Sequence, residues 1–192
     1  ACGGETLTIR LYALIHTSAG TVAHESAPAG RLLDEAGVTV IWEKGPPDSE
    51  EGRLDDWTPG LVPDRRAYLV VRLVQGPPDD RPEADLGYAL PFVWRGAHVT
   101  VYYNRVEKLF FSAKAMPSIG SLLGGAMAHE IGHVLLGSAG HSTQGVMKAN
   151  WGPKEFRLLG CKALHFTPED ATALRAGASG RLAIGRTLAT CP

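Results

Sequence analysis

An apolar helical segment with three polar residues in it constrains the fold of this chain more than any other feature. The stretch from Ser118 to about Gly137 predicts one long helix, and its second half carries His129, Glu130 and His133 among apolar neighbours. Burying such groups is costly unless hydrogen bonds, partner charges or a metal satisfy them. The fold must therefore bury this helix and still provide partners for its polar side chains.

The spacing of these polar residues favours a metal ion as their partner. Residues at i and i+4 lie on one face of a helix, so the imidazoles of His129 and His133 can converge on one cation. Glu130 lies about a quarter turn away and can contact a water on that cation without binding the ion. Two imidazoles and a carboxylate base are typical of metal-assisted hydrolysis. The motif alone leaves open a second interpretation, an amphipathic helix with two surface histidines.

A turn after the helix can bring a third histidine to the same ion. Gly137 offers a helix C-cap, and Gly140 adds flexibility just before His141. Three neutral imidazoles with an open fourth position are the pattern of a catalytic zinc site. We therefore expect one Zn²⁺ with His141 as its third ligand. The alternatives for that ligand are His165, Asp170 and Glu155.

The remaining sequence predicts an α+β fold with a mixed sheet. Strand-like stretches lie at 6–15, 38–42, 68–74 and 98–103, and we expect 38–42 to be compact and buried. Pro91 restricts the stretch 86–94 to an edge strand. Helices are expected at 19–36, with Pro28 as a possible kink or start, and from Pro168 to about Gly177. The active-site helix would pack on the sheet, and a small loop-rich lobe with one helix would follow.

Composition and charge exclude several classes of protein. The 192 residues suit one domain, and 44% hydrophobic residues with 20% charged residues are typical of a globular chain. The net charge of −1 lacks the basic footprint of a nucleic-acid-binding protein. No stretch approaches the roughly 18 apolar residues of a transmembrane segment. Since the sequence begins at Ala1 and not at Met, we expect that an upstream segment has been removed.

The motif region resembles the active sites of metzincin zinc peptidases, and it is most similar to matrixins. Their pattern is His-Glu-x-x-His-x-x-Gly-x-x-His followed by a methionine turn. Here His141-Ser142 precedes Gly145-Val146-Met147, and 166–175 looks like the helix that follows that turn. The stretch from Ile9 to about Arg175 is also similar to uncharacterised bacterial secreted proteins with HEIGH…HS…GIM motifs. The resemblance implies three zinc ligands, a general base and a methionine under the metal, which are His129, His133 and His141, then Glu130, then Met147.

One spacing departs from the metzincin pattern. Counted from His129, the glycine and the third histidine fall at +8 and +12 instead of +7 and +10, so two extra residues separate His133 from His141. Loops tolerate such insertions, and His141 can still be the ligand if the loop absorbs them. Ala149 stands where some metzincins have a tyrosine ligand, so we expect no fifth ligand.

The resemblance also implies an architecture and a substrate. We expect a mostly parallel, twisted sheet with an antiparallel edge strand, in one catalytic domain of residues 1–192. Its upper lobe would be 1–137 and its lower lobe 138–192. The edge strand would pair with an extended peptide, and Trp151 and Asn150 would line the pocket beside the metal. For Trp151, a place in the core is an equally good interpretation.

These observations together predict a zinc-dependent endopeptidase. The metal would activate a water, and Glu130 would take its proton and pass it to the leaving amine. The alternatives are a zinc hydrolase of a non-peptide amide or ester, and a non-catalytic binding protein that retains a metal. We expect a peptide or protein substrate, a monomer, and no nucleic-acid partner.

The three cysteines predict an extracytoplasmic protein. Cys161 and Cys191 flank the last expected helix, and a disulfide between them would tie the C-terminal tail to the lower lobe. A Cys2–Cys191 bond is the alternative pairing. Ala-Cys-Gly-Gly at the start resembles the processing site of a bacterial lipoprotein, so Cys2 could instead carry a lipid anchor. We therefore expect a secreted or otherwise extracytoplasmic protein, with or without that anchor.

Overall fold

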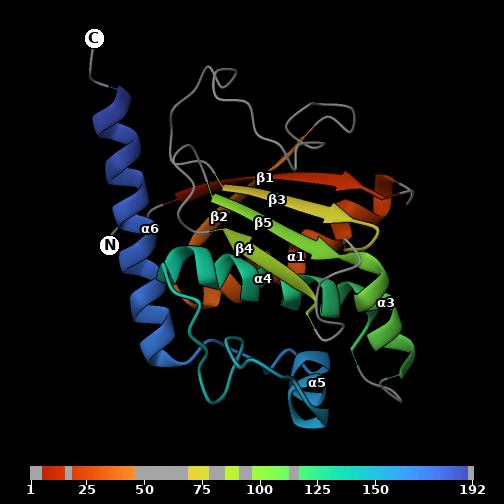
Figure 1. The fold of residues 1–192 in the computed structure, drawn as a ribbon. Coiled ribbons are helices and arrows are strands. Elements are labelled where there is room, and N and C mark those ends of the chain that lie inside the picture. Colours follow the sequence, from red (N-terminus) through yellow and green to blue (C-terminus); the bar gives the residue numbers. More distant parts are fainter. Residues whose placement is uncertain are drawn as a thin grey trace.

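A five-stranded sheet forms the centre of the molecule (Figure 1). The computed structural model describes residues 6–15, 19–45, 69–77, 85–90, 97–112 and 117–189. The strand order is β2-β1-β3-β5-β4, with β4 antiparallel to β5 and all other neighbours parallel. The strands are β1 (Thr6–Leu14), β2 (Thr39–Lys44), β3 (Leu69–Val74), β4 (Gly87–Leu90) and β5 (Ala97–Tyr102). The predicted α+β class, with a mostly parallel sheet and an antiparallel edge strand, is confirmed.

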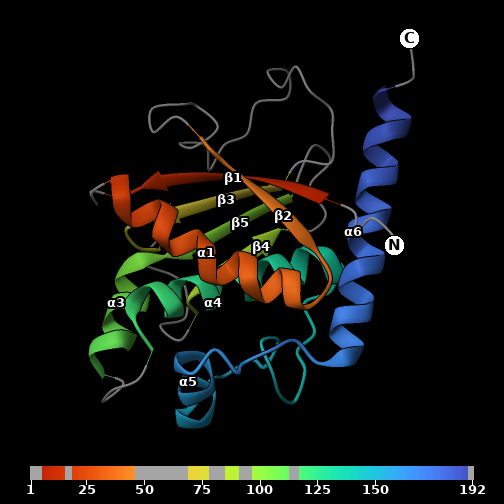
Figure 2. The same cartoon turned by 180° about the vertical axis from the view of Figure 1, so that it is seen from behind.

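Alternate residues of the central strands form an apolar face that meets two helices. Successive strand side chains point to opposite faces of a sheet, and one face here carries a fully apolar set. That set is buried and consists of Leu7, Ile9, Leu11, Leu69, Leu73, Val71, Val99 and Val101. Helices α1 (Ala19–Glu35) and α4 (Ile119–Leu136) lie side by side against this face (Figures 1 and 2). The core therefore lies between the sheet and these two helices.

Helix α4 has the bounds that the sequence predicts. The side chain of Ser118 accepts a hydrogen bond from the Ser121 N–H, and Gly137 ends the helix in the left-handed conformation with φ 61°. By length and composition α4 is the one described helix that could cross a membrane, but 67% of it is buried inside the protein, as in a core helix. It contacts α1, β4, β5 and the three other described helices, so residues on it have fixed positions relative to most of the fold.

Two helices of the structure were not predicted. Helix α3 (Tyr103–Ser112) continues directly from β5, and its aromatic start looks like more strand. Helix α5 (Pro153–Gly160) follows Gly152, and a proline at its first position and Glu155 in its first turn were signals that could have identified it. The predicted single C-terminal helix is therefore wrong, because the segment after Gly137 has two, α5 and α6 (Pro168–Ala189). Helix α6 starts as predicted but extends well beyond Gly177.

Strand β2 differs from its prediction as well. It was expected to be buried, but it is an edge of the sheet and pairs with β1 alone among the described strands. Ile41 is 53% exposed as a result. An apolar stretch of sequence indicates that a strand forms there. The burial of that strand depends on its position in the sheet, which the stretch itself does not determine. The division into lobes at Gly137 stays a prediction.

Candidate metal centre

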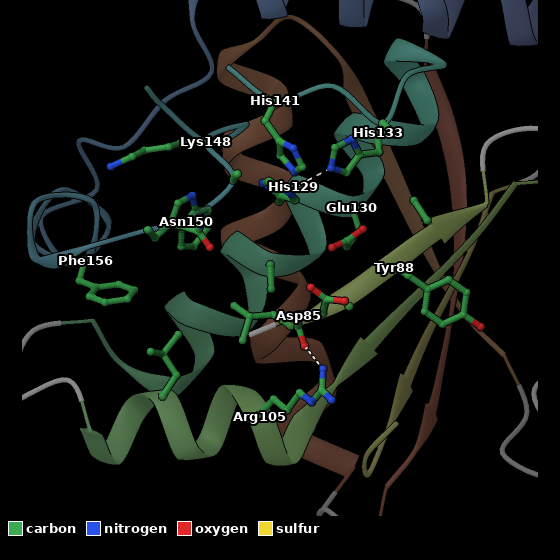
Figure 3. Close-up of a pocket in the computed structure, with 18 of the residues that line it drawn as sticks. Asp85, Tyr88, Arg105, His129, Glu130, His133, His141, Lys148, Asn150 and Phe156 are labelled. Carbon is green, nitrogen blue, oxygen red and sulfur yellow. Dashed lines mark hydrogen bonds between the residues drawn. The ribbon is translucent and has the colours of Figure 1, made fainter. Parts of the chain in front are cut away.

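His129 and His133 point at the same place from successive turns of α4. Their Nε2 atoms are 3.1 Å apart, and their ring centroids are 4.7 Å apart (Figure 3). Ligands bound tetrahedrally at 2.0–2.1 Å from one zinc ion stand about 3.3 Å apart. The predicted convergence of the two imidazoles is therefore present, at a separation suited to one ion.

The opposite ring nitrogens identify the tautomer of both histidines. The Nδ1 of His129 lies 2.7 Å from the Val146 carbonyl, and the Nδ1 of His133 lies 2.9 Å from the Ser138 carbonyl. A carbonyl oxygen can only accept, so each Nδ1 carries the proton and donates it. In a neutral imidazole this leaves a lone pair on each Nε2. Backbone carbonyls in this position are the usual supports of metal-binding histidines.

Burial keeps these two imidazoles neutral. The pKa of His129 is lowered from 6.5 to about 4, mainly by desolvation on burial. The nearby His133 and His141 also lower this pKa, and the hydrogen bond to the Val146 carbonyl opposes the shift. Burial also lowers the pKa of His133, and the hydrogen bond to the Ser138 carbonyl partly opposes this shift by raising it. At neutral pH two lone pairs therefore face each other at 3.1 Å. That arrangement is repulsive unless a cation lies between them, and a metal ion meets this requirement.

His141 brings a third imidazole to the pair. It comes from the exposed loop after α4, and its ring stacks on His129 with centroids 5.3 Å apart. One nitrogen from each of the three histidines lies within 4.8 Å of the other two. The two extra residues before His141 lie in the exposed turn at 138–140. In this turn the Ser138 hydroxyl accepts a hydrogen bond from the Gly140 N–H. Three imidazoles in this arrangement fit a zinc ion.

The three alternative ligands have other partners. His165 pairs with Glu35 on α1 at 2.8 Å. Asp170 accepts from the Ser142 hydroxyl at 2.8 and 3.0 Å, and so holds the residue next to His141. Glu155 pairs with Lys148 at 2.9 Å and accepts from the Gly152 N–H. None of them belongs to the histidine cluster that could hold an ion.

Met147 packs under the histidine helix. It is fully buried, and a β-carbon added to Gly132 would lie 2.4 Å from its Sδ. Gly132 lies between the two histidines of α4, so only a residue without a side chain lets the methionine approach there. Val146, the preceding residue, supplies the carbonyl that holds His129. The turn therefore supports the site through both residues, with the Val146 carbonyl bound to His129 and Met147 packed against α4.

Trp151 combines the two roles considered for it. Its Nε1–H donates to the Val146 carbonyl at 3.2 Å, the same oxygen that holds His129, and its ring stands edge-on to His129 at 6.2 Å. It packs against the hydrophobic core and also lines a cleft that extends from the histidines to α3. Asn150, whose side chain is exposed, lines the same cleft (Figure 3). Trp151 is therefore both a wall of the cleft and a partner of the residues that support the metal centre.

Glu130 lies in the same cleft, beside the start of β4. Its side chain is 8% exposed. A β-carbon on Gly87 would lie 3.2 Å from the Glu130 Cγ and 2.5 Å from the Thr100 carbonyl oxygen. Gly87 therefore leaves the space that the carboxylate occupies. No motif in the sequence indicated this glycine, because the contact joins residues far apart in the chain.

The cleft has a volume of about 1190 Å³ and connects the histidines to α3. Its walls come from β4, α3, α4, the segment around Trp151 and Phe156 of α5. Helix α3 contributes Arg105, Lys108, Leu109 and Ser112, none of which was predicted as a site residue. Figure 3 shows Arg105 and Asp85 on the far side of Glu130 from the histidines.

The cysteine prediction receives no support. Cys161 is exposed and carries a free thiol. Its predicted partner Cys191, and Cys2, lie outside the described residues. The predicted bond to Cys161 is therefore not supported, and the alternative Cys2–Cys191 pairing stays a prediction.

The comparisons with known proteins reveal a shared fold. No protein-family model and no curated protein matches the chain. Among solved structures, the chain is similar to archaemetzincin from Methanopyrus kandleri, with 15% identity, a TM-score of 0.50, and coverage of 91% of this chain and 96% of that one. Metalloproteinase-II from Bacteroides fragilis gives 14% identity and a TM-score of 0.48, and the alignment covers 91% of this chain but 53% of that one. The first similarity supports the metzincin-like fold; the matrixin-like resemblance stays a prediction.

Proposed function

We propose that this chain is a zinc-dependent endopeptidase, with one zinc ion held by His129, His133 and His141. The observation that carries the proposal is the pair of Nε2 lone pairs 3.1 Å apart, each with its Nδ1 proton held by a carbonyl. Two imidazoles with a purely structural role do not need lone pairs that face each other. A cation bound between them needs both lone pairs as ligands. The metzincin-like fold of the solved neighbour agrees with the proposal.

The chemistry of the reaction would be shared between the ion and Glu130. A zinc ion in such a site supplies Lewis-acid polarisation of a carbonyl and lowers the pKa of a water to about 7. The Glu130 carboxylate accepts the proton of the attacking water on an oxygen and returns it to the leaving amine nitrogen. The contact with Gly87 limits the positions open to this carboxylate. Glu130 is therefore the general base and then the general acid of the proposed cycle.

Strand β4 would hold the substrate by the edge with which no other described strand pairs. The Tyr102 N–H donates to the Leu86 carbonyl at 2.9 Å, and hydrogen-bonded and non-hydrogen-bonded pairs alternate in an antiparallel ladder. Gly87 and Ala89 therefore turn their N–H and C=O groups away from β5. Both line the cleft. An extended peptide can add to these groups as a further strand, which favours a peptide over a small amide or ester.

Location and assembly are separate proposals. We keep the predicted extracytoplasmic location, with Cys2 as a possible lipid attachment site, and the predicted monomer. Fractionation of the native protein and its mass in solution test these two points without reference to the activity.

The direct test measures metal and cleavage together. We expect one zinc per chain by elemental analysis, and cleavage of casein and of quenched peptides blocked at both ends. The Glu130→Gln variant should retain zinc but lose about 10²- to 10⁴-fold in rate, because the general base is removed. Glu169→Gln, a change of an exposed carboxylate on α6, is the matched control and should cleave at the normal rate. Equal cleavage by Glu130→Gln and the unaltered protein would refute the mechanism.

A further inference from the structure

His141 differs from the two histidines of α4 in how its ring is supported. The Nδ1 atoms of those two histidines are each held by a backbone carbonyl. Within the described part of the chain, no carbonyl or polar side chain forms a hydrogen bond with the His141 ring, which lies in an exposed loop against the other two imidazoles. The position of this imidazole therefore depends on its own backbone and on the contacts of its neighbours in the chain.

Ser142, the next residue, is tied to the fold at two points. Its N–H donates to the Met147 carbonyl at 2.9 Å, and this bond joins the loop to the methionine turn in a short parallel bridge. Its hydroxyl lies 2.8 and 3.0 Å from the two carboxylate oxygens of Asp170 on α6. Two anchors on one residue restrict its rotation as well as its position, so the peptide group that joins it to His141 has a defined orientation.

Asp170 can serve as an anchor because its own position is fixed. It is buried, its N–H donates to the Thr167 hydroxyl at 3.1 Å, and its Oδ2 accepts from the Thr167 N–H at 3.4 Å. This reciprocal pair caps the start of α6. The carboxylate that accepts from Ser142 is therefore part of the first turn of a helix and not of a second loop.

Helix α6 is in turn packed against α4, the helix that carries the other two histidines (Figures 1 and 2). Arg181 of α6 donates to the Val134 carbonyl of α4 at 2.8 Å. The two backbones approach so closely that a β-carbon at Gly177 would collide with the Leu135 carbonyl. Through Asp170, the loop that carries the third histidine is therefore fixed relative to the same helix as the first two.

We propose that Ser142 and Asp170 are positioning residues of the metal centre, and that their hydrogen bond holds the His141 imidazole at the ion site before zinc binds. This inference rests on the zinc site of the proposed function and leaves the chemistry at the ion unchanged. A loop that is already ordered in the metal-free protein loses little conformational freedom on binding, so more of the interaction energy appears as affinity. A loop without this anchor would have to be ordered by the zinc ion itself. The hydroxyl of Ser142 therefore controls how tightly the chain holds its metal.

The zinc affinity of matched variants tests the proposal. Ser142→Ala removes the hydroxyl and leaves His141 in place, and its Kd for zinc should rise about 10- to 100-fold, the usual cost of losing a residue that supports a metal ligand. Thr143→Val is the matched control, because it removes the hydroxyl of the next residue, which is exposed, and its Kd should change by less than about twofold. Competition with a chromophoric chelator measures these constants. Equal Kd values for Ser142→Ala and the unaltered protein would overturn the inference.

A conservative variant and a double variant assign the effect to the hydrogen bond. Ser142→Thr keeps a hydroxyl and should restore most of the zinc affinity. Asp170→Asn keeps an acceptor oxygen but not the charge, so it should weaken zinc binding less than Ser142→Ala does. In the Ser142→Ala protein, the further change Asp170→Asn should raise the Kd by less than about twofold, because both residues act through one contact. Effects that multiply in the double variant would show that Asp170 does not act through Ser142.

Hydrogen exchange of the metal-free protein separates positioning from a general loss of stability. The N–H of residue 142 is bonded to the Met147 carbonyl, so it should be protected in the unaltered protein. In Ser142→Ala this amide should exchange about tenfold faster, relative to the intrinsic rate of each sequence, because the loop opens locally. The amide of Ile131, buried in α4, should keep its rate. An equal acceleration of both amides would mean that the hydroxyl stabilises the whole fold, and would overturn the positioning role.

The zinc measurements also distinguish this inference from the proposed function. If the unaltered protein binds one zinc ion and Ser142→Ala binds it equally well, the inference fails and the proposed function stands. If the unaltered protein binds no zinc, the proposed function fails as well.

Discussion

The sulfur of Met147 packs against Gly132, the residue just before His133 on α4, the helix that carries two of the three histidines of the candidate metal centre. A β-carbon at Gly132 would stand 2.4 Å from that sulfur and 3.3 Å from the Phe166 ring. Real β-carbons do not approach this closely, so the methionine turn and α4 fit together only because residue 132 is a glycine. This contact links the turn that holds His129 to the helix that carries it.

We predict that Gly132→Ala destabilises the protein by about 1–3 kcal/mol, the usual cost of overpacking a core. Helix propensity alone predicts the opposite, since alanine favours a helix by about 1 kcal/mol over glycine. Urea unfolding with and without zinc gives the sign. In the control Met147→Leu, which nearly conserves volume, the cost should be less than about 1.5 kcal/mol, with zinc retained. A more stable Gly132→Ala protein would show that the contact is wrong.

His141→Ala should weaken zinc binding strongly, because only two imidazoles remain for the ion. His165→Ala is the matched control: it removes a histidine that pairs with Glu35 and has no part in the cluster. Zinc content after dialysis against a weak chelator distinguishes the two variants. Full retention of zinc by His141→Ala would eliminate it as the third ligand.

Gly87→Ala should lower kcat and leave the zinc content unchanged. The added methyl group would meet the Glu130 side chain at 3.2 Å and the Thr100 carbonyl at 2.5 Å, so Glu130, the proposed general base, would have to move. Misplacing a catalytic group by about 1 Å can cost on the order of 10²-fold in rate. Ala89→Gly, which changes the same face of β4 two residues away, should have a much smaller effect on kcat. Loss of zinc from Gly87→Ala would point to general damage of the fold.

The metal-free protein should lose stability as the pH falls from about 6.5 to 4. The pKa of His129 is lowered to about 4 in the folded state against 6.5 in the unfolded state, mainly by burial. Between these values the unfolded chain binds the proton and the folded chain does not, so acid favours unfolding. The contribution of neutral His129 to the free energy of unfolding is fully present above pH 6.5. The loss between pH 6.5 and 4 is about 3 kcal/mol, from a shift of about 2.5 pKa units at about 1.4 kcal/mol each.

Thermal unfolding of the metal-free protein across this pH range measures the effect. The variant His129→Gln has no proton to bind at this position, so its stability should change less over the same interval. An equal slope in both proteins would show that another group is responsible.

Much of the metal centre could be predicted because its elements are local. The i, i+4 spacing of His129 and His133 needs only a helix, and Gly137 needs only a left-handed cap, so both are confirmed as geometry. His141 was harder to predict because two extra residues precede it, and its position depends on how an exposed loop turns. The hydroxyl of Ser142, bonded to Asp170, anchors that loop from a distant helix.

The parts that could not be predicted depend on contacts between distant segments. Residues at the start of α3 look like strand because aromatic and β-branched side chains favour both a strand and a buried helix face. Strand β2 looks buried by composition and is exposed by its position in the sheet. A short window of neighbouring residues shows neither whether the start of α3 is helix or strand nor whether β2 is buried or exposed.

The sequence by itself determined the chemistry that is available: the histidines and the carboxylate on one apolar helix, the cap that ends it, and the alternation that makes the sheet. These depend on interactions within a few residues, where propensity and periodicity act. Only the tertiary structure decided how that chemistry is surrounded: which carbonyls hold the imidazoles, why residues 87 and 132 have no side chain, and which helices line the cleft. The physical reason is that close packing joins segments far apart in the chain, and its distances arise only when the whole core has formed.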